Sequence, residues 1–269
     1  MATSDVDQQS TSFDLGNNNE DDENDSSAMS LVEHLEELRW RIFKSLIAIT
    51  VGSIIAFIFR IQIMNFLVAP LPLAANGLSK ITGHTLTVTG LGEGFGVFLK
   101  LSIVVGVILA LPVILYQTWA FIAPGLYAKE KKYAAPFIII GLVLFLLGVS
   151  LGYIVLQYPV QWLVNFGQSS FNELITAGSY FSFVSIFLLV FGLIFELPLV
   201  LTFLAKVGII SGETLRQKRA PAHVGLWIAS TFVTPGADLY SPIFIGVSLS
   251  VLYELSIILI RFMVKPDVE

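Results

Sequence analysis

Six long apolar runs constrain the fold of this chain more than any other feature of its sequence. A helix needs about 20 apolar residues to cross roughly 30 Å of hydrocarbon. The runs lie at about 42–59, 97–121, 136–156, 181–203, 222–233 and 242–260. The fifth has only about a dozen residues, so by itself it also fits a segment that re-enters the membrane. We count it as a span, because Arg219 and Arg261 then fall on the same side as the other basic clusters.

The composition supports the same class of protein. Of the 269 residues, 55% are hydrophobic and only 13% are charged, and the mean hydropathy is +0.80. A soluble core of this size would need more polar surface to cover it. Cysteine is absent, which excludes disulfides, thiolate zinc sites and iron–sulfur clusters. We therefore predict an all-α membrane protein with six transmembrane helices.

The basic residues predict its orientation. Six spans place both termini on one side of the membrane, and that side carries twelve of the fifteen Lys and Arg residues. The other three are Arg60, Lys80 and Lys100. Because loops rich in Lys and Arg stay in the cytoplasm, both termini are predicted to be cytoplasmic. The chain is then a multi-pass protein of the cytoplasmic (inner) membrane.

The first 28 residues differ in character from the rest. They contain eight Asp and Glu, no Lys or Arg, and few large apolar residues. Such a segment cannot bury enough apolar surface to offset its ordering entropy. We predict a disordered acidic tail at 1–28, a six-span membrane domain at 29–265 and a short C-terminal tail at 266–269.

The segment SLVEHLEELRWRIF, which begins at Ser30, predicts a short amphipathic helix. Ser30 and Glu33 have the spacing of a capping box, and leucines recur at helical intervals after them. The helix runs into the first span, so we expect it to lie at the membrane interface. Glu37 and Arg41 are four residues apart in the order that favours an ion pair. From the residues alone, that simple pairing is the leading interpretation of Glu37.

A carboxylate inside the fourth apolar run is the main functional candidate within the membrane. Glu196 lies ten residues before Lys206, about 15 Å along a helix, at a depth where a charge costs roughly 2.5–3.5 kcal/mol on insertion scales. Pro198 follows and predicts a kink. Glu196 either faces a polar cavity or partner group, or only caps a neighbouring helix. Asp238, in TPGADLYSP, lies in a turn between the last two runs, where its role is either functional or that of a turn residue.

The chain lacks the motifs of common catalytic and metal sites. It has no H-E-x-x-H, P-loop, G-x-S-x-G or S-x-x-K, and its three histidines are far apart in sequence. We therefore predict no catalytic residue, metal or cofactor, and no enzymatic activity. From the residues, a proton-coupled secondary transporter of a small solute that uses Glu196 is the alternative function.

Five segments in order resemble the motifs of the TatC family of the twin-arginine protein translocase. The first is VEHLEELRWR. The second is a long central motif made of GEGFGVFLKL and LPVILYQTWAFIAPGLYAKEKK. The last three are FGLIFELP, VGIISGETLRQKRA and TPGADLYSP. The resemblance covers about residues 30 to 262. It implies a core receptor subunit that binds twin-arginine signal peptides. With TatA- and TatB-type single-span partners it would export folded proteins using the proton motive force.

The resemblance also implies which residues carry that function. The signal-peptide-binding positions fall on Glu37, Arg39, Phe121 and Glu130. The family's intramembrane carboxylate falls on Glu196. With it we group Gln117 and Asp238 as polar or partner-binding candidates within the membrane, and Pro70, Pro124 and Pro198 as structural prolines. Further implied contacts are with membrane lipid and with other copies of the chain, and none is with nucleic acid.

A physical argument supports the two implied carboxylates. Glu37 and Glu130 are both predicted at the cytoplasmic rim, on separate elements, so each could take one guanidinium of an arginine pair. Arginine binds carboxylate bidentately, whereas lysine is only a point charge. The lysines around Glu130 would favour its ionised form, and Phe121 could stack on a guanidinium.

Overall fold

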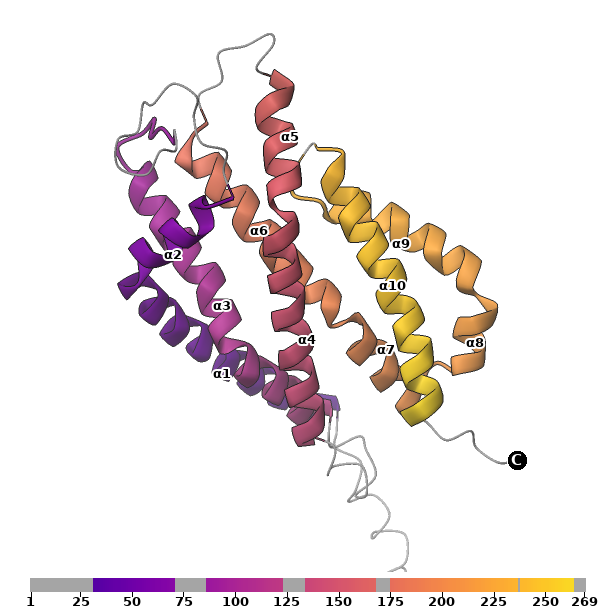
Figure 1. The fold of residues 1–269 in the computed structure, drawn as a ribbon. Helices are drawn as coiled ribbons and strands as arrows, with labels where there is room; N and C mark the ends of the chain where they lie inside the picture. Colours follow the sequence, from indigo (N-terminus) through magenta and orange to yellow (C-terminus); the bar gives the residue numbers. More distant parts are fainter. Residues whose placement is uncertain (1–30, 71–85, 123–133, 168–174, 237, 264–269) are drawn as a thin grey trace, which may run out of the picture. The chain divides into compact units, whose positions relative to one another are not determined.

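The computed structural model describes residues 31–70, 86–122, 134–167, 175–236 and 238–263, which are almost entirely helical (Figure 1). The helices are α1 (Leu31–Ile58), α2 (Arg60–Val68), α3 (Glu93–Ile122), α4 (Ala134–Val155), α5 (Gln157–Gly167), α6 (Ala177–Phe195), α7 (Leu197–Lys206), α8 (Gly212–Gln217), α9 (Arg219–Val233) and α10 (Tyr240–Met263). The chain divides into two compact units, Met1–Trp40 and Arg41–Glu269. The packing described below is that of the second unit.

Helices occur at all six predicted apolar runs. Five stretches are long and apolar enough to cross a membrane: Glu33–Ile58, Glu93–Ile122, Ala135–Phe166, Ala177–Lys206 and Tyr240–Phe262. The predicted fifth span corresponds to α9, whose 15 residues measure about 22 Å. That is shorter than a hydrocarbon core of roughly 30 Å. The six-span count and the side on which the termini lie therefore stay predictions.

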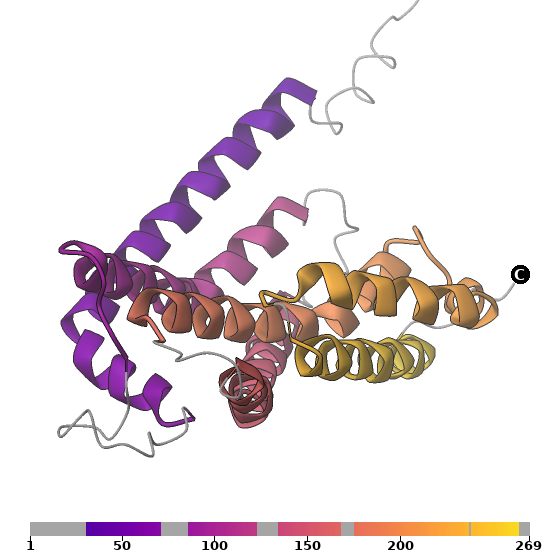
Figure 2. The same cartoon turned by 90° about the horizontal axis from the view of Figure 1, so that it is seen from above.

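Several helices end together at a basic margin of the bundle. In Figure 1, α4 begins and α7 and α10 end toward the lower part of the picture. Lys206 lies in the last turn of α7 and Arg261 in the last turn of α10. We call this the basic end and the other the opposite end. Figures 1 and 2 both show α9 running beside α10.

Helices α4 and α6 make their closest approach through glycines. A Cβ atom at Gly148 would lie 2.6 Å from the carbonyl oxygen of Phe191, and one at Gly192 would lie 2.6 Å from ring carbons of Phe145. Both phenylalanines are fully buried. Small residues let membrane helices pack closely because lipid gives no hydrophobic drive for their association. The close contact between α4 and α6 therefore depends on residues that have no side chain.

The kink predicted at Pro198 is confirmed. Helix α6 ends at Phe195 and α7 begins at Leu197, so Glu196 joins them. Pro198 lies in the first turn of α7, where its missing N–H removes no helical hydrogen bond. The break therefore places the Glu196 carboxylate at a helix junction rather than in a continuous helix.

At the opposite end, Glu93 joins the starts of α3 and α6. Its Oε2 accepts hydrogen bonds from the backbone N–H of Thr89 (2.6 Å) and from the Thr89 hydroxyl (2.9 Å). Its Oε1 accepts one from the backbone N–H of Gly178 (2.8 Å), in the first turn of α6. One carboxylate thus accepts hydrogen bonds from backbone N–H groups just before α3 and in the first turn of α6, groups that lack a partner within a helix. The glycine-rich run TGLGEGFG is helical from Glu93 onward.

Two tyrosines hold the end of α2. The Tyr180 hydroxyl donates to the carbonyl oxygen of Leu67 at 2.7 Å, and the Tyr153 hydroxyl donates to that of Phe66 at 2.8 Å. Carbonyls in the last turn of a helix lack partners within the helix, so these bonds fasten α2 to α6 and α4. The connection between the first two predicted spans therefore contains an anchored helix. Pro70, a predicted structural proline, follows its end.

Candidate functional site

Glu37 lies in the first unit, on the initial turns of α1. Its side chain is partly exposed, and its Oε2 lies 4.0 Å from Nδ1 of His34, one turn earlier. Arg39 is exposed two residues later. Glu33, Glu36 and Glu37 make this turn acidic, at the motif position that the sequence predicted for signal-peptide binding.

The last turns of α3 bring together two of the predicted polar and aromatic residues. Gln117 and Phe121 are four residues apart, so they lie on one face of the helix, and both are half-buried. Nη1 of Arg41 donates to Oε1 of Gln117 at 3.4 Å, a long and therefore weak hydrogen bond. Arg41 and the end of α3 consequently meet at the basic end.

An aromatic cluster anchors this end of α3. The Trp119 ring lies 4.7 Å from the Phe137 ring on α4 and 6.1 Å from the Phe203 ring on α7, and Phe137 and Phe203 are also 6.1 Å apart. Trp119 is buried. Because residues two apart point to different sides of a helix, Trp119 fixes α3 in the bundle while Phe121 lies on another side.

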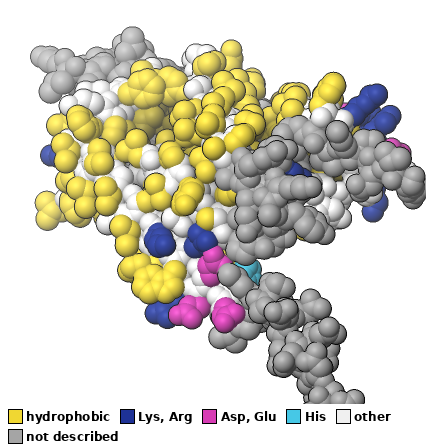
Figure 3. Space-filling view, turned by 90° about the horizontal axis from the view of Figure 1, so that it is seen from below, with side chains coloured by type: hydrophobic (Ala, Val, Ile, Leu, Met, Phe, Trp, Pro, Cys, Tyr) yellow, Lys and Arg dark blue, Asp and Glu magenta, His cyan; other side chains and the backbone are white. Residues whose placement is uncertain are grey.

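Two of the predicted residues, Glu130 and Pro124, lie outside the described residues. Their distance from Glu37 and Phe121 therefore stays a prediction. Figure 3 is seen from the side of the basic end and shows Lys and Arg side chains beside apolar ones.

Glu196 is buried with 8% of its surface exposed. Neither of its carboxylate oxygens has a hydrogen-bond partner among the described residues. Oε2 faces α4: a Cβ atom at Gly141 would lie 3.2 Å from it and would also contact Leu115 and Leu199. The carboxylate is therefore enclosed between α3, α4 and α7 by apolar groups.

An enclosed carboxyl without partners is unusual, because burying a polar group costs free energy unless it is hydrogen-bonded. The cost is larger at membrane depth. Of the two sequence interpretations, the structure gives no sign that the Glu196 side chain caps a neighbouring helix, since no described donor reaches it. The group is available to a donor that enters from elsewhere.

Asp238 has a structural partner. Its Oδ1 accepts from the backbone N–H of Ser241 at 2.6 Å and its Oδ2 accepts from the Ser241 hydroxyl at 2.7 Å. Asp238 is buried and precedes α10 by two residues, which is the position of a helix cap. Of the two roles left open by the sequence, the geometry supports that of a turn residue.

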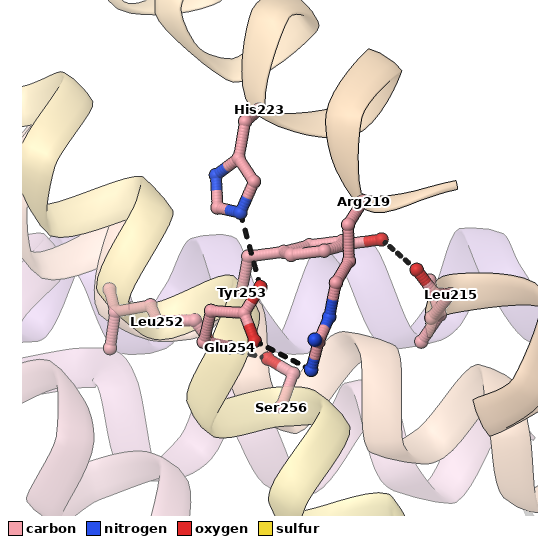
Figure 4. Close-up of polar contacts among 7 residues, drawn as sticks. All are labelled: Leu215, Arg219, His223, Leu252, Tyr253, Glu254 and Ser256. Atoms are coloured by element: carbon pink, nitrogen blue, oxygen red, sulfur yellow. Dashed lines mark hydrogen bonds and ion pairs between the residues drawn. The ribbon is translucent and has the colours of Figure 1, made fainter. Parts of the chain in front are cut away.

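The sequence interpretation missed one polar cluster. Glu254 on α10 contacts both Arg219 and His223 on α9 (Figure 4). His223 is 31 residues from Glu254, and no spacing rule connects residues on two different helices.

The comparisons with known proteins identify the family. The family model described as Sec-independent protein translocase protein (TatC) matches residues 33–247. The TatC protein of Desulforapulum autotrophicum is 41% identical over 227 residues, which cover 84% of this chain and 82% of that protein. That of Carboxydothermus hydrogenoformans is 40% identical over 239 residues, covering 88% and 95%. TatCy of Bacillus subtilis is 34% identical over 233 residues, covering 86% and 88%.

A solved structure also matches this chain. The crystal structure of the twin arginine translocase receptor TatC matches with a TM-score of 0.72 and 34% sequence identity, covering 87% of this chain and all of that one. The proteins matched are named as translocase components, which is a transport role rather than a catalytic one. The family model covers most of the chain and these relatives share 34–41% of its residues, so this chain belongs to the TatC family of Sec-independent protein translocase proteins.

Proposed function

We propose that this chain is the receptor subunit of a twin-arginine translocase and binds twin-arginine signal peptides at its basic end. The observation that carries the proposal is the family match over residues 33–247, which includes the motif positions of Glu37, Gln117 and Phe121. The contact of Arg41 with Gln117 supports it, because polar groups of α1 and α3 meet at the basic end.

The chemistry of recognition follows from the residue types. Two carboxylates, Glu37 and Glu130, each take one guanidinium of the arginine pair. A planar guanidinium forms two parallel hydrogen bonds with a carboxylate, and an ammonium cannot reproduce that geometry. Phe121 supports the adjoining apolar part of the signal peptide from the last turn of α3, while the buried Trp119 cluster keeps that turn in place.

The chain acts in the inner membrane as a multi-pass protein. We propose that its partners are TatA- and TatB-type single-span proteins and other copies of itself, and that export of folded cargo uses the proton motive force. Family membership favours this function over the small-solute transporter, and it leaves Glu196 with a role in the translocase.

That role is to meet a polar group that enters the bundle. Glu196 is too far from the basic end to contact the arginine pair, since it lies ten residues from Lys206. Its two oxygens have no donor among the described residues. A polar group on a partner's span, or on a deeply inserted signal peptide, would satisfy them.

The decisive experiment measures the affinity of the purified protein in nanodiscs for a fluorescent signal peptide. We expect binding of the Arg-Arg peptide and at least tenfold weaker binding of its Lys-Lys variant. Glu37→Ala and Glu130→Ala should each weaken binding by roughly 2–5 kcal/mol if the ion pairs are buried on binding. Glu36→Ala, an exposed acid on the same turn as Glu37, is the matched control. Equal affinity for both peptides, or unchanged affinity in both variants, would refute the proposal.

A further inference from the structure

The first predicted span packs against the bundle through one face of α1. From Arg41 to Ile58, a stretch that the structure describes throughout, only Gly52 and Ala56 are buried. They are four residues apart, so they lie on the same face of the helix. Exposed apolar residues cover its other faces, among them Ile42, Leu46, Ile54 and Ile58. The position of α1 therefore depends on what the face of Gly52 contacts.

Gly52 brings α1 into main-chain contact with α3. A Cβ atom at Gly52 would lie 2.7 Å from the carbonyl oxygen of Gly106. One at Gly106 would lie 2.6 Å from the backbone nitrogen of Ser53 and 2.8 Å from its Cα. The Ser53 hydroxyl bonds within its own helix, to the carbonyl oxygen of Ile49 at 2.8 Å. The crossing is therefore held by close packing of small residues, which lets membrane helices approach through their backbones.

The contact of the two helices toward the basic end fits this crossing. Arg41 lies 11 residues before Gly52 on α1. Its partner Gln117 lies 11 residues after Gly106 on α3. Equal steps in opposite directions are expected of two antiparallel helices in one register, because every helical residue adds the same rise along the axis.

The contact toward the opposite end fits the same register. Arg60 follows Gly52 by 8 residues, and its guanidinium carbon lies 5.7 Å from the centroid of the Phe98 ring. Phe98 in turn precedes Gly106 by 8 residues. A guanidinium within about 6 Å of a ring is held by a weak cation–π attraction. Of these three levels of contact, the glycine level is the one at which no flexible side chain can adjust.

The hydrogen bond between Arg41 and Gln117 is sensitive to the spacing of the helices. It is already 3.4 Å long, beyond the usual range of about 2.7–3.2 Å. An alanine Cβ at Gly52 would have to move from 2.7 Å to the 3.4 Å at which ordinary van der Waals contact begins, so the helices would separate by about 0.7 Å. With the side chains in their present conformations, that separation takes Arg41 out of hydrogen-bonding range of Gln117.

We infer that Gly52 and Gly106 are positioning residues for signal-peptide recognition. Their main-chain contact sets how closely α1 approaches α3 and in which register, and so where Arg41 meets Gln117. The inference rests on the proposed function, because it takes a twin-arginine signal peptide as the ligand and draws its site from both helices. A bidentate pair of guanidinium and carboxylate depends on orientation, whereas an ammonium acts as a point charge. A shift of α1 should therefore weaken binding of an Arg-Arg peptide more than that of its Lys-Lys variant.

The experiment makes the same substitution at two glycines of α3. Gly106→Leu places a side chain against the backbone of Ser53. Gly96→Leu is the matched control, because Gly96 is exposed and no atom lies within 4 Å of a Cβ built there. Dissociation constants of the Arg-Arg and Lys-Lys peptides are measured in nanodiscs. We expect the preference for Arg-Arg to fall from at least tenfold to about threefold or less in Gly106→Leu, and to stay unchanged in Gly96→Leu.

The displacement itself is measured by EPR in the same variants. The chain has no cysteine, so spin labels attach only at Leu46→Cys on α1 and Val113→Cys on α3, two exposed positions. The mean distance between the labels should lengthen in Gly106→Leu and stay unchanged in Gly96→Leu. Gly52→Ala is a smaller change at the same contact and serves where Gly106→Leu does not fold. It should reduce the preference for Arg-Arg about twofold or more.

The preference separates loss of position from loss of fold. A variant that only unfolds in part offers fewer binding sites, but the ratio of its two dissociation constants stays that of the wild-type protein. If the wild-type protein prefers Arg-Arg and both Gly106→Leu and Gly52→Ala keep that preference, the positioning role is overturned and the proposed function stands. An unchanged label distance in Gly106→Leu would also overturn the positioning role. A wild-type protein without preference would overturn the proposed function, and this inference with it.

Discussion

The contact between α4 and α6 gives the sharpest test of the packing. Gly148→Ala adds one methyl group where a Cβ atom would lie 2.6 Å from the carbonyl oxygen of Phe191 and 2.8 Å from Cβ of Phe195. Neither atom is the flexible end of a side chain, so the helices themselves must move apart. Adding a methylene to a well-packed core costs about 1–3 kcal/mol. Alanine regains at most about 1 kcal/mol of helix propensity. A net loss of up to about 2 kcal/mol is expected.

Gly225→Ala provides the control for the same chemical change. Gly225 is exposed on α9, and no atom lies within 4 Å of a Cβ built there. Only the propensity gain applies, so this variant should be unchanged or about 1 kcal/mol more stable. Because the propensity gain is common to both variants, they should differ by the overpacking cost alone, about 1–3 kcal/mol.

The assay is the free energy of unfolding, measured by denaturant titration in mixed micelles. A shift of 1 kcal/mol corresponds to about 2–4 °C in the melting temperature of a protein of 150–250 residues, so thermal unfolding is an independent check. Equal stability of Gly148→Ala and Gly225→Ala would refute the argument that α4 and α6 meet at main-chain contact. A loss of similar size in Gly225→Ala would show that glycine itself, not the close approach, is required.

Three further outcomes are expected. Deletion of residues 1–28 should leave membrane insertion and export intact, because the tail has little apolar surface to pack; loss of folding would contradict this. Glu93→Gln should retain part of the hydrogen bonding between α3 and α6, whereas Glu93→Ala should lose it and so speed hydrogen exchange at the Gly178 amide. Equal exchange at this amide in the two variants would contradict the role of Glu93. Glu196→Gln should keep most export if a neutral carboxyl is the working form, while Glu196→Ala should lose it with signal-peptide docking unchanged. Normal export by Glu196→Ala would remove this residue from the mechanism.

The sequence predicted the features that depend on local composition. Helix positions followed from apolar length, because a membrane span must satisfy its own backbone hydrogen bonds. The break at Glu196 followed from Pro198, whose effect is confined to neighbouring residues. The anchored helix α2 was missed, because its end is held by hydroxyls of Tyr153 and Tyr180 that lie 87 and 113 residues away from their acceptors.

Contacts between helices were harder to predict for a physical reason. In a soluble protein, polar residues mark the outer side of a helix, but in a membrane both the lipid side and the packed side are apolar. Helix α4 accordingly shows no polar face in its sequence, although Phe145 is fully buried and Leu147 is half exposed. What distinguishes the packed side is the absence of a side chain, as at Gly148, or the presence of a charge that needs a partner, as at Glu254. A charge inside an apolar run indicates that a partner is needed but does not identify it. Only the packing of α9 on α10 shows that the partners of Glu254 are Arg219 and His223.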